Sequence, residues 1–314
     1  MKAAVVYEPK QGPVYADFDH PIAGQNQQLI TVKASAISHV VKSRASGKHY
    51  SFDGVLPFIA GTDGVGITPQ GERVWFAFPP SPWGAMAQYA PVDYAHCLPL
   101  PDNLDDATAA AMANPGMSAW AALVMRAGFK AGETVLINGA TGSAGRLAVQ
   151  IARYLGAKKV IATGRNPQAL ASLNADVTVL LSEDDLSLTQ AFVEQAAEQV
   201  DVVIDYLWGN SAENLLKALA KYSPGIAPVR YVQVGSLAGQ EISLPGAVLR
   251  SSPLQLMGSG IGSLPMSALI QATGDMLQAA VPGQFTIAHK VVPLSQVAEA
   301  WPQDDSKNRT VFTV

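Results

Sequence analysis

The pattern of apolar and polar positions changes near residue 132. Before it, short apolar runs separated by glycine and proline predict strands, at residues 3–7, 28–32, 64–67, 73–77 and 87–89. After it, apolar runs alternate with helical stretches, and strands are expected at residues 134–137, 160–163, 177–181, 202–205, 231–234 and 254–257. Because strands that alternate with helices form parallel sheets, the sequence predicts an α/β fold, in which a six-stranded doubly wound, Rossmann-type sheet follows a mostly-β region.

The last part of the chain has a mixed pattern. We expect a helix near residues 266–280, a strand at 288–292, a short helix at 294–301 and a last strand at 310–314. A chain of 314 residues is about twice the length of a typical single domain, which favours two domains. We place a doubly wound domain at 117–262 and a mostly-β domain at 1–116 and 263–314, to which the tail returns.

Charge and cysteine content exclude several classes of protein. Lys and Arg number 21 against 25 for Asp and Glu, and no basic block is present that would neutralise phosphates along a nucleic acid. Cys97 is the only cysteine, so neither an intrachain disulfide nor a four-cysteine zinc site can form. The N-terminus lacks a signal peptide's apolar core, and Pro115 interrupts the longest uncharged stretch, residues 107–125. We expect a cytoplasmic protein that binds neither nucleic acid nor membranes.

A glycine-rich turn follows the strand at 134–137 and leads into a helical stretch. Such a turn points backbone N–H groups and the positive end of the helix dipole at one spot, which suits the pyrophosphate of a dinucleotide. Ala140 replaces the first glycine of the usual pattern, and the alternative is an ordinary strand-to-helix turn. The further alternating strands and helices favour the dinucleotide. The candidate residues are Thr141, Gly142, Ser143, Ala144 and Gly145.

The next strand, 160–163, ends where a dinucleotide fold contacts the adenine ribose. Folds that bind NAD(H) carry an acid near this point, whereas a 2′-phosphate repels an acid and favours a guanidinium. No acid stands here, and the candidate residues are Thr163, Gly164, Arg165 and Asn166. The sequence therefore predicts NADP(H) rather than NAD(H), with a solvated loop arginine as the alternative for Arg165.

Several segments resemble the zinc-independent quinone oxidoreductases of the medium-chain dehydrogenase/reductase superfamily. They are the glycine turn 139–145, residues 34–40 with Arg44, residues 56–66, and further on 84–89, 117–120, 201–205 and 258–259. Ser38 and Thr62 stand where zinc-dependent relatives carry metal ligands; both side chains bind zinc poorly, so no metal is expected. The resemblance covers essentially the whole chain and implies that the mostly-β domain is a GroES-like catalytic domain.

The resemblance and the strand ends supply further cofactor contacts. Ser38 and Ser118 are expected near the nicotinamide and its ribose, with packing serines as the alternative. The fourth strand ends at the carboxyl edge where a doubly wound sheet opens, and the fifth and sixth end in residues that resemble those flanking the nicotinamide. Such positions also carry ordinary turn residues. The candidates are Tyr206, Leu207, Trp208, Val234, Gly235, Ser236, Leu237 and Ser259.

Hydride transfer without a metal suits electron-poor acceptors such as quinones and α,β-unsaturated carbonyl compounds, because the reaction can end with a proton from solvent or a hydroxyl. Tyr50 and Ser38 are the catalytic candidates, Tyr50 as proton donor, although an exposed loop tyrosine is the alternative. Phe52, Phe78 and Trp83 are candidates to stack on a flat acceptor.

The assembly and two rival functions complete these expectations. Relatives commonly pair through the last strand of the cofactor domain, which predicts a homodimer through residues 254–259. One rival is a non-catalytic NADPH-binding sensor or structural protein on the same fold. The other is an alcohol or aldehyde reductase, against which the missing zinc ligands argue.

Overall fold

The expected parallel sheet lies in the second of two compact units into which the chain divides, residues 116–269. The computed structural model describes residues 1–181, 184–223, 227–305 and 307–314. Along this sheet the strand order is β11-β10-β9-β12-β13-β14 and all pairs are parallel, as in a Rossmann fold. The predicted fold class is confirmed. The strands are β9 (Thr134–Asn138), β10 (Lys159–Gly164), β11 (Val177–Leu180), β12 (Val202–Asp205), β13 (Val229–Gln233) and β14 (Leu254–Gly258).

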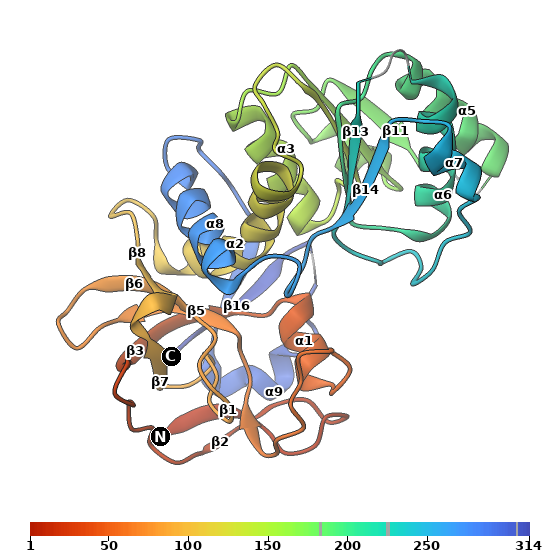
Figure 1. Cartoon of the computed structure of the whole chain (residues 1–314). Coiled ribbons are helices and arrows are strands. Elements are labelled where there is room, and N and C mark those ends of the chain that lie inside the picture. The colour runs from red at the N-terminus through yellow and green to blue at the C-terminus, as the bar shows by residue number, and fades with distance from the viewer. Residues whose placement is uncertain (182–183, 224–226, 306) are drawn as a thin grey trace. The chain divides into compact units, whose positions relative to one another are not determined.

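Helices cover both faces of this sheet (Figure 1). One face packs against α3, whereas α5 and α6 pack on the other, where Phe192 and Leu215 join Leu136 and Ile161 in one buried cluster. Burial on both sides explains why the strands are almost continuously apolar. The helices are α3 (Ser143–Tyr154), α4 (Pro167–Ala171), α5 (Asp185–Ala197), α6 (Gly209–Tyr222) and α7 (Gly246–Arg250).

The other unit, residues 1–115 with 270–314, is built mainly from antiparallel strands. A three-stranded sheet has the order β2-β1-β4, and a larger sheet has the order β15-β16-β3-β5-β6-β8, with β7 also paired to β3. The strands are β1 (Lys2–Val6), β2 (Val14–Asp17), β3 (Gln27–Ala36), β4 (Phe58–Ile59), β5 (Asp63–Ile67), β6 (Arg73–Ala77), β7 (Tyr89–Asp93), β8 (Cys97–Pro99), β15 (His289–Pro293) and β16 (Arg309–Thr313).

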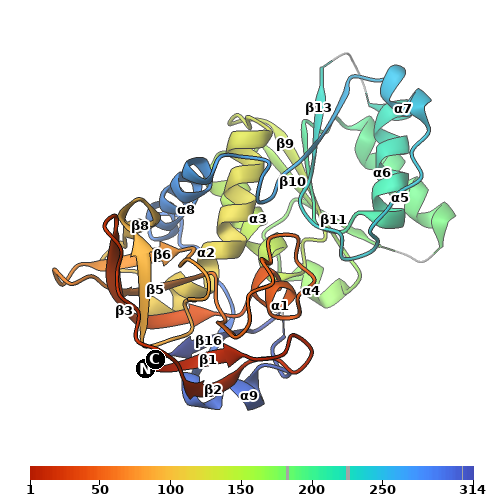
Figure 2. The same ribbon diagram turned by 60° about the horizontal axis from the view of Figure 1, so that its bottom comes forward.

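The C-terminal segment completes the larger sheet of this unit. β16 pairs antiparallel with β3, so that Val311 lies opposite Ala36, and it pairs on its other side with β15. Figure 2 shows β1, β2 and α9 (Val297–Ala300) grouped beside this strand. The short helix α1 (His39–Ala45) follows β3 directly. Two longer helices, α2 (Asp106–Trp120) and α8 (Met266–Ala280), run across the sequence limits of the two units, and α2 continues as a π-helical segment, Ala121–Arg126.

Three features of the antiparallel unit differ from the sequence-based expectation. The strand expected at 87–89 instead runs over Tyr89–Asp93, and it contains Pro91, which a sequence pattern counts against a strand but an edge position tolerates. The strands β2, β4 and β8 were not expected. They are so short that an alternation of apolar and polar residues cannot be recognised in them. A helix passes through Pro115, where an interruption was expected.

The helix α2 continues because another donor replaces the one that proline lacks. In a regular helix the N–H of residue 115 would bond the carbonyl oxygen of Ala111, and proline has no N–H. The buried Arg309 donates from Nη1 to that oxygen at 3.5 Å. Among the described residues, no helix is both long enough and apolar enough to cross a membrane.

Candidate functional site

The turn between β9 and α3 depends on two glycines. Gly139 has a φ of +90°, and a Cβ there would lie 2.9 Å from the side chain of Leu207. A Cβ on Gly145 would lie 2.4 Å from the carbonyl oxygen of Gly139, so α3 can approach the turn this closely only with glycine at 145. Thr163 fixes the turn from β10, since its hydroxyl accepts from Gly139 N at 3.0 Å and its carbonyl oxygen from Ala140 N at 2.8 Å.

The N-terminus of α3 fits a bound anion. Gly142 is the N-cap and supplies no side-chain oxygen to the first turn, and a Cβ built on it meets no atom within 4 Å. The space beside Gly142 is therefore open, at the positive end of the dipole of a twelve-residue helix. A pyrophosphate group fits this environment. The predicted residues Thr141 to Gly145 form this turn.

A buried polar network lies beneath the turn, where β9, β10, β12 and β13 end. Asn138 Nδ2 donates to Asp205 Oδ1 at 2.8 Å and to Ser211 Oγ at 2.9 Å. Thr163 Oγ1 donates to Asn138 Oδ1 at 2.7 Å, and Tyr231 Oη donates to Asp205 Oδ2 at 2.8 Å. Burial raises the pKa of the Asp205 carboxyl group, and the hydrogen bonds that it accepts oppose this shift. The network joins the turn to the neighbouring strand ends.

Asp205 also holds the segment that follows β12. Its carboxylate accepts from Leu207 N at 2.9 Å and from Trp208 N at 3.2 Å. Trp208 has a φ of +58°, a conformation that a bulky residue adopts only when its surroundings impose it. Tyr206 is buried, and burial raises the pKa of its phenol while the side chain of Ser118 opposes the shift. The structure thus brings together Ser118 with residues 206–208.

The residues predicted at the end of β13 lie against the same segment. The N–H groups of Val234 and Gly235 both donate to the carbonyl oxygen of Asp205, at 2.7 and 3.1 Å, and Leu237 N donates to Tyr206 O at 3.3 Å. Ser236 Oγ donates to Gln240 Oε1 at 3.2 Å. Ser259, at the end of β14, donates its N–H to Gln233 O at 2.8 Å, which places it beside the end of β13.

The residues predicted to bind the 2′-phosphate stand at the end of β10. A Cβ on Gly164 would lie 2.5 Å from the methyl group of Thr141, so this strand end touches the glycine turn. Arg165 is exposed, and Asn166 caps α4 by accepting from Ala169 N at 2.8 Å. An exposed guanidinium such as that of Arg165 can bind an anion beside the turn.

The two catalytic candidates lie in the antiparallel unit, on either side of α1. Ser38 is 4% exposed and caps α1, its hydroxyl accepting from Val41 N at 3.2 Å. Tyr50 is 72% exposed, and its ring stacks on His49 with 4.3 Å between centroids. The structure does not bring these two residues into one pocket.

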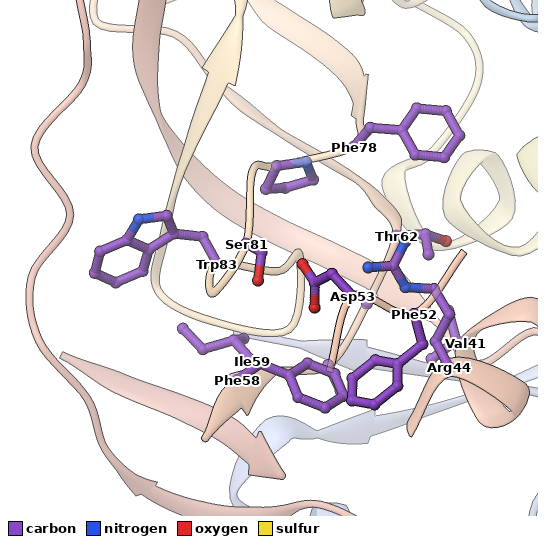
Figure 3. Close-up of a pocket in the computed structure, with 13 residues that line it drawn as sticks. Val41, Arg44, Phe52, Asp53, Phe58, Ile59, Thr62, Phe78, Ser81 and Trp83 are labelled. Carbon is purple, nitrogen blue, oxygen red and sulfur yellow. The ribbon is translucent and has the colours of Figure 1, made fainter. Parts of the chain in front are cut away.

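A pocket in the antiparallel unit collects the three aromatic residues predicted to stack on an acceptor, Phe52, Phe78 and Trp83 (Figure 3). Phe58 lies against Phe52 with ring centroids 5.5 Å apart, and Val41 and Ile59 extend the apolar wall. The remaining lining residues are Arg44, Asp53, Ala60, Gly61, Thr62, Pro79 and Ser81. The pocket therefore combines aromatic side chains with charged and polar groups.

Comparison with known proteins decides the family. No protein-family model matches the chain. The probable NADPH-dependent quinone reductase tdiC of Emericella nidulans is 30% identical over 347 aligned residues, which cover 96% of each protein. The chain belongs to the zinc-independent quinone oxidoreductases of the medium-chain dehydrogenase/reductase superfamily. The predicted family and the prediction that the protein is an oxidoreductase are thereby confirmed.

Other relatives agree with this family. Human quinone oxidoreductase is 29% identical over 268 residues, which cover 81% of this chain and 79% of that protein. The solved quinone oxidoreductase of Thermus thermophilus covers the whole of both chains with a TM-score of 0.81 and 24% identity. A mycobacterial quinone oxidoreductase reaches a TM-score of 0.84 with 19% identity, also over the whole of both chains. These structures share the fold of the family.

Ser38 and Thr62 stand at the positions where zinc-dependent relatives carry metal ligands. Ser38 caps α1 and Thr62 donates its hydroxyl to Asp63 at 2.9 Å, so both hydroxyls are engaged within the protein. Within the part of the chain that the structure describes, no three His, Cys, Asp or Glu side chains cluster closely enough to hold a metal ion.

Sequence reasoning missed the polar residues beneath the turn and within the pocket. Asn138, Tyr231 and Ser211 are each more than twenty positions from the partner they contact, so spacing along the chain does not reveal them. The one available signal was a polar residue at the end of an apolar strand, as at Asn138 and Asp205. Asp53 and Ser81 gave no signal at all.

Proposed function

We propose that this protein is an NADPH-dependent, zinc-free oxidoreductase that transfers hydride to a quinone or an α,β-unsaturated carbonyl compound. The observation that carries the proposal is the open N-terminus of α3 above the buried network, at the carboxyl edge of a Rossmann sheet. The names of the relatives in Emericella nidulans and human support the acceptor class, and the first also names the cofactor. We propose residues 117–262 as the cofactor-binding domain and 1–116 with 263–314 as the catalytic domain.

The mechanism assigns a task to each group of residues. When bound, NADPH supplies the hydride. The turn Thr141 to Gly145 holds the pyrophosphate, and Arg165, with its neighbours 163–166, holds the 2′-phosphate. Ser118, the segments 206–208 and 234–237, and Ser259 line the strand ends toward the ribose and nicotinamide. Ser38 lies toward the nicotinamide and helps to orient it. Tyr50 donates the proton that completes the reduced acceptor.

The cofactor preference is tested with one arginine and a matched control. Purified protein is mixed with NADPH or NADH and a panel of quinones, enones and aldehydes, and the loss of nicotinamide absorbance is followed. Arg165→Ala should lower kcat/KM for NADPH by about tenfold or more while leaving NADH unchanged, because a charged hydrogen bond to phosphate contributes about 1.5–3 kcal/mol. Arg250→Ala, which removes an exposed arginine from α7, should change neither value.

Each alternative function has its own outcome in this assay. Equal use of NADPH and NADH by the unaltered protein would refute the assignment to Arg165. Saturable NADPH binding without turnover of any acceptor would favour a non-catalytic sensor, and turnover of aldehydes alone would favour an alcohol or aldehyde reductase.

We also propose that two copies pair through β14. This strand stands at the end of the parallel sheet and bonds to β13 on one side only among the strands that the structure describes. Its residues carry no charge, and Leu256 is 36% exposed, whereas exposed edges of monomers usually carry charges or proline. A second β14 related by a two-fold axis would continue the sheet.

A further inference from the structure

We propose that the guanidinium group of Arg44 donates hydrogen bonds to the carbonyl oxygen of the acceptor, at the atom on which negative charge develops as hydride is added. This inference rests on the proposed function and assigns the acceptor to the pocket drawn in Figure 3. Arg44 is then a catalytic residue, because it contacts the carbonyl oxygen of the acceptor.

The guanidinium group has unused donors. Arg44 is half-buried near the end of α1, and among the described residues it donates one hydrogen bond, from Nη1 to Ser51 Oγ at 3.4 Å. The Asp53 carboxylate is its nearest opposing charge but forms no ion pair with it within 4.0 Å. An arginine has five N–H donors in a planar fork, so several remain for a ligand. In Figure 3 the guanidinium lies between Asp53 and Thr62.

The other polar side chains of the pocket have committed their hydrogens. Thr62 donates its hydroxyl to Asp63 at 2.9 Å, and the Ser81 side chain stabilises the charged Asp53 carboxyl group and helps to lower its pKa. A carboxylate itself only accepts hydrogen bonds. Asp53 also accepts from Val55 N at 3.1 Å, which fixes its place in the wall. The indole of Trp83 lies on the far side of the pocket from Arg44 (Figure 3). An acceptor oxygen in this pocket therefore finds its donor at Arg44.

The walls suit a flat ring held against that donor. Phe52 and Phe58 are inclined by 45° to one another and form one apolar side, and Phe78 and Trp83 also line the pocket. Aromatic rings of this kind stack favourably on planar ligands. A guanidinium at the edge of an aromatic pocket selects a planar compound with a carbonyl oxygen at its rim.

The chemistry explains why a cation is useful at this position. In conjugate reduction the hydride forms a C–H bond at the carbon β to the carbonyl, the C=C and C=O π bonds shift, and an electron pair ends on the oxygen. NADPH is oxidised to NADP⁺, the acceptor is reduced to an enolate, and one proton from Tyr50 or solvent completes the product. A donor fixed at the forming oxyanion stabilises the transition state more than the ground state.

The test measures both turnover and binding. Arg44→Gln should lower kcat with a quinone acceptor by about 10²–10³-fold, the usual effect of removing one oxyanion donor, with a smaller change in KM. Arg44→Lys should recover part of kcat because it keeps the charge but loses the fork. The control Lys48→Gln removes an exposed cation from the loop after α1 and should leave kcat unchanged. The Kd for NADPH should stay within about twofold in all three variants.

A binding measurement locates the acceptor without relying on turnover. 1,4-Naphthoquinone should quench the tryptophan fluorescence of the unaltered protein, and Trp83→Phe should remove part of that quenching. A normal kcat in Arg44→Gln, together with normal turnover by the unaltered protein, would overturn the role of Arg44 and leave the proposed function standing. Quenching that Trp83→Phe does not alter would overturn the assignment of the pocket. Absence of turnover with every acceptor would overturn the proposed function itself.

Discussion

Asp205 is a fully buried carboxylate that receives hydrogen bonds from an amide, a phenol and two backbone N–H groups. A buried charge is tolerated only when it is well paired or hydrogen-bonded, and these donors supply that environment. Because Asp205 lies beneath the glycine turn and beside residues 206–208, we expect it to act as a positioning residue for the cofactor site. The Asp205 side chain is fully buried and has no exposed surface.

Asp205→Asn should weaken NADPH binding by about tenfold or more. If the asparagine keeps its oxygen toward Leu207 N and Asn138 Nδ2, its NH2 group faces Trp208 N and Tyr231 Oη, which donate to the native carboxylate. Buried donors are then left unpaired, at a cost of about 1–3 kcal/mol each. The matched control is Asp201→Asn. Asp201 bonds Thr134 N at 2.8 Å at the opposite, amino end of the same strands.

Titration of protein fluorescence with NADPH gives the Kd of each variant, and thermal unfolding gives its stability. Both variants should lower Tm, but only Asp205→Asn should raise the Kd. If both variants raised the Kd equally, Asp205 would have a structural role alone.

At the scale of elements, α2 shows how one residue far along the chain permits a helix through proline. Arg309 donates to the carbonyl oxygen of Ala111, the acceptor that Pro115 leaves without its helical partner. Burial lowers the pKa of the Arg309 guanidinium, and the opposing charges of Asp63 and Asp304 counter this shift. The helix is continuous, but its ordinary hydrogen bond is replaced by a longer one of 3.5 Å.

Pro115→Ala should therefore raise the free energy of unfolding, by about 1–3 kcal/mol, because proline in a helix interior costs about 3 kcal/mol relative to alanine. Pro167→Ala is the control. Pro167 stands in the first turn of α4, where no hydrogen bond is lost and the fixed φ is favourable, so its replacement should not stabilise. Chemical denaturation of the two variants measures the difference, and an unchanged or lower midpoint for Pro115→Ala would contradict this account.

Sequence patterns predicted the elements that depend on neighbours along the chain. The strands β9 to β14 and the helix α8 appear within a few residues of their expected positions, because apolar runs and helical periodicity are local. The strands β2, β4 and β8 depend on partners elsewhere in the fold, and β7 tolerates Pro91 only because it is an edge strand. At the site, the glycine turn was visible in the sequence, whereas the hydrogen bonds to Asn138 and Asp205 form only after folding.

The whole molecule should be a dimer in solution. Light scattering during gel filtration should give a mass of about twice 32.9 kDa. Leu256→Glu places a charge on β14, at the edge of the sheet, and should reduce the mass to that of one chain. Leu249→Glu alters another exposed leucine, on α7 and outside the strand, and should leave the dimer intact. A single-chain mass for the unaltered protein would exclude pairing through β14.

The pairing of β16 with β3 has a consequence for how the chain is made. A ribosome completes β3 at Ala36 but delivers β16 only at residues 309–313, after the whole of unit 116–269 has emerged. β7 pairs residues 27–31 of β3 early, but on that side residues 34–36 pair with β16. At roughly 5–20 residues per second, this end of β3 waits for about 14–55 seconds without that partner. During that interval the inserted Rossmann unit can fold from contiguous sequence, while the backbone groups at the 34–36 end of β3 stay unpaired on one side. Nascent chains should therefore engage holding chaperones through their N-terminal strands, and pairing of β16 with β3 should end that need.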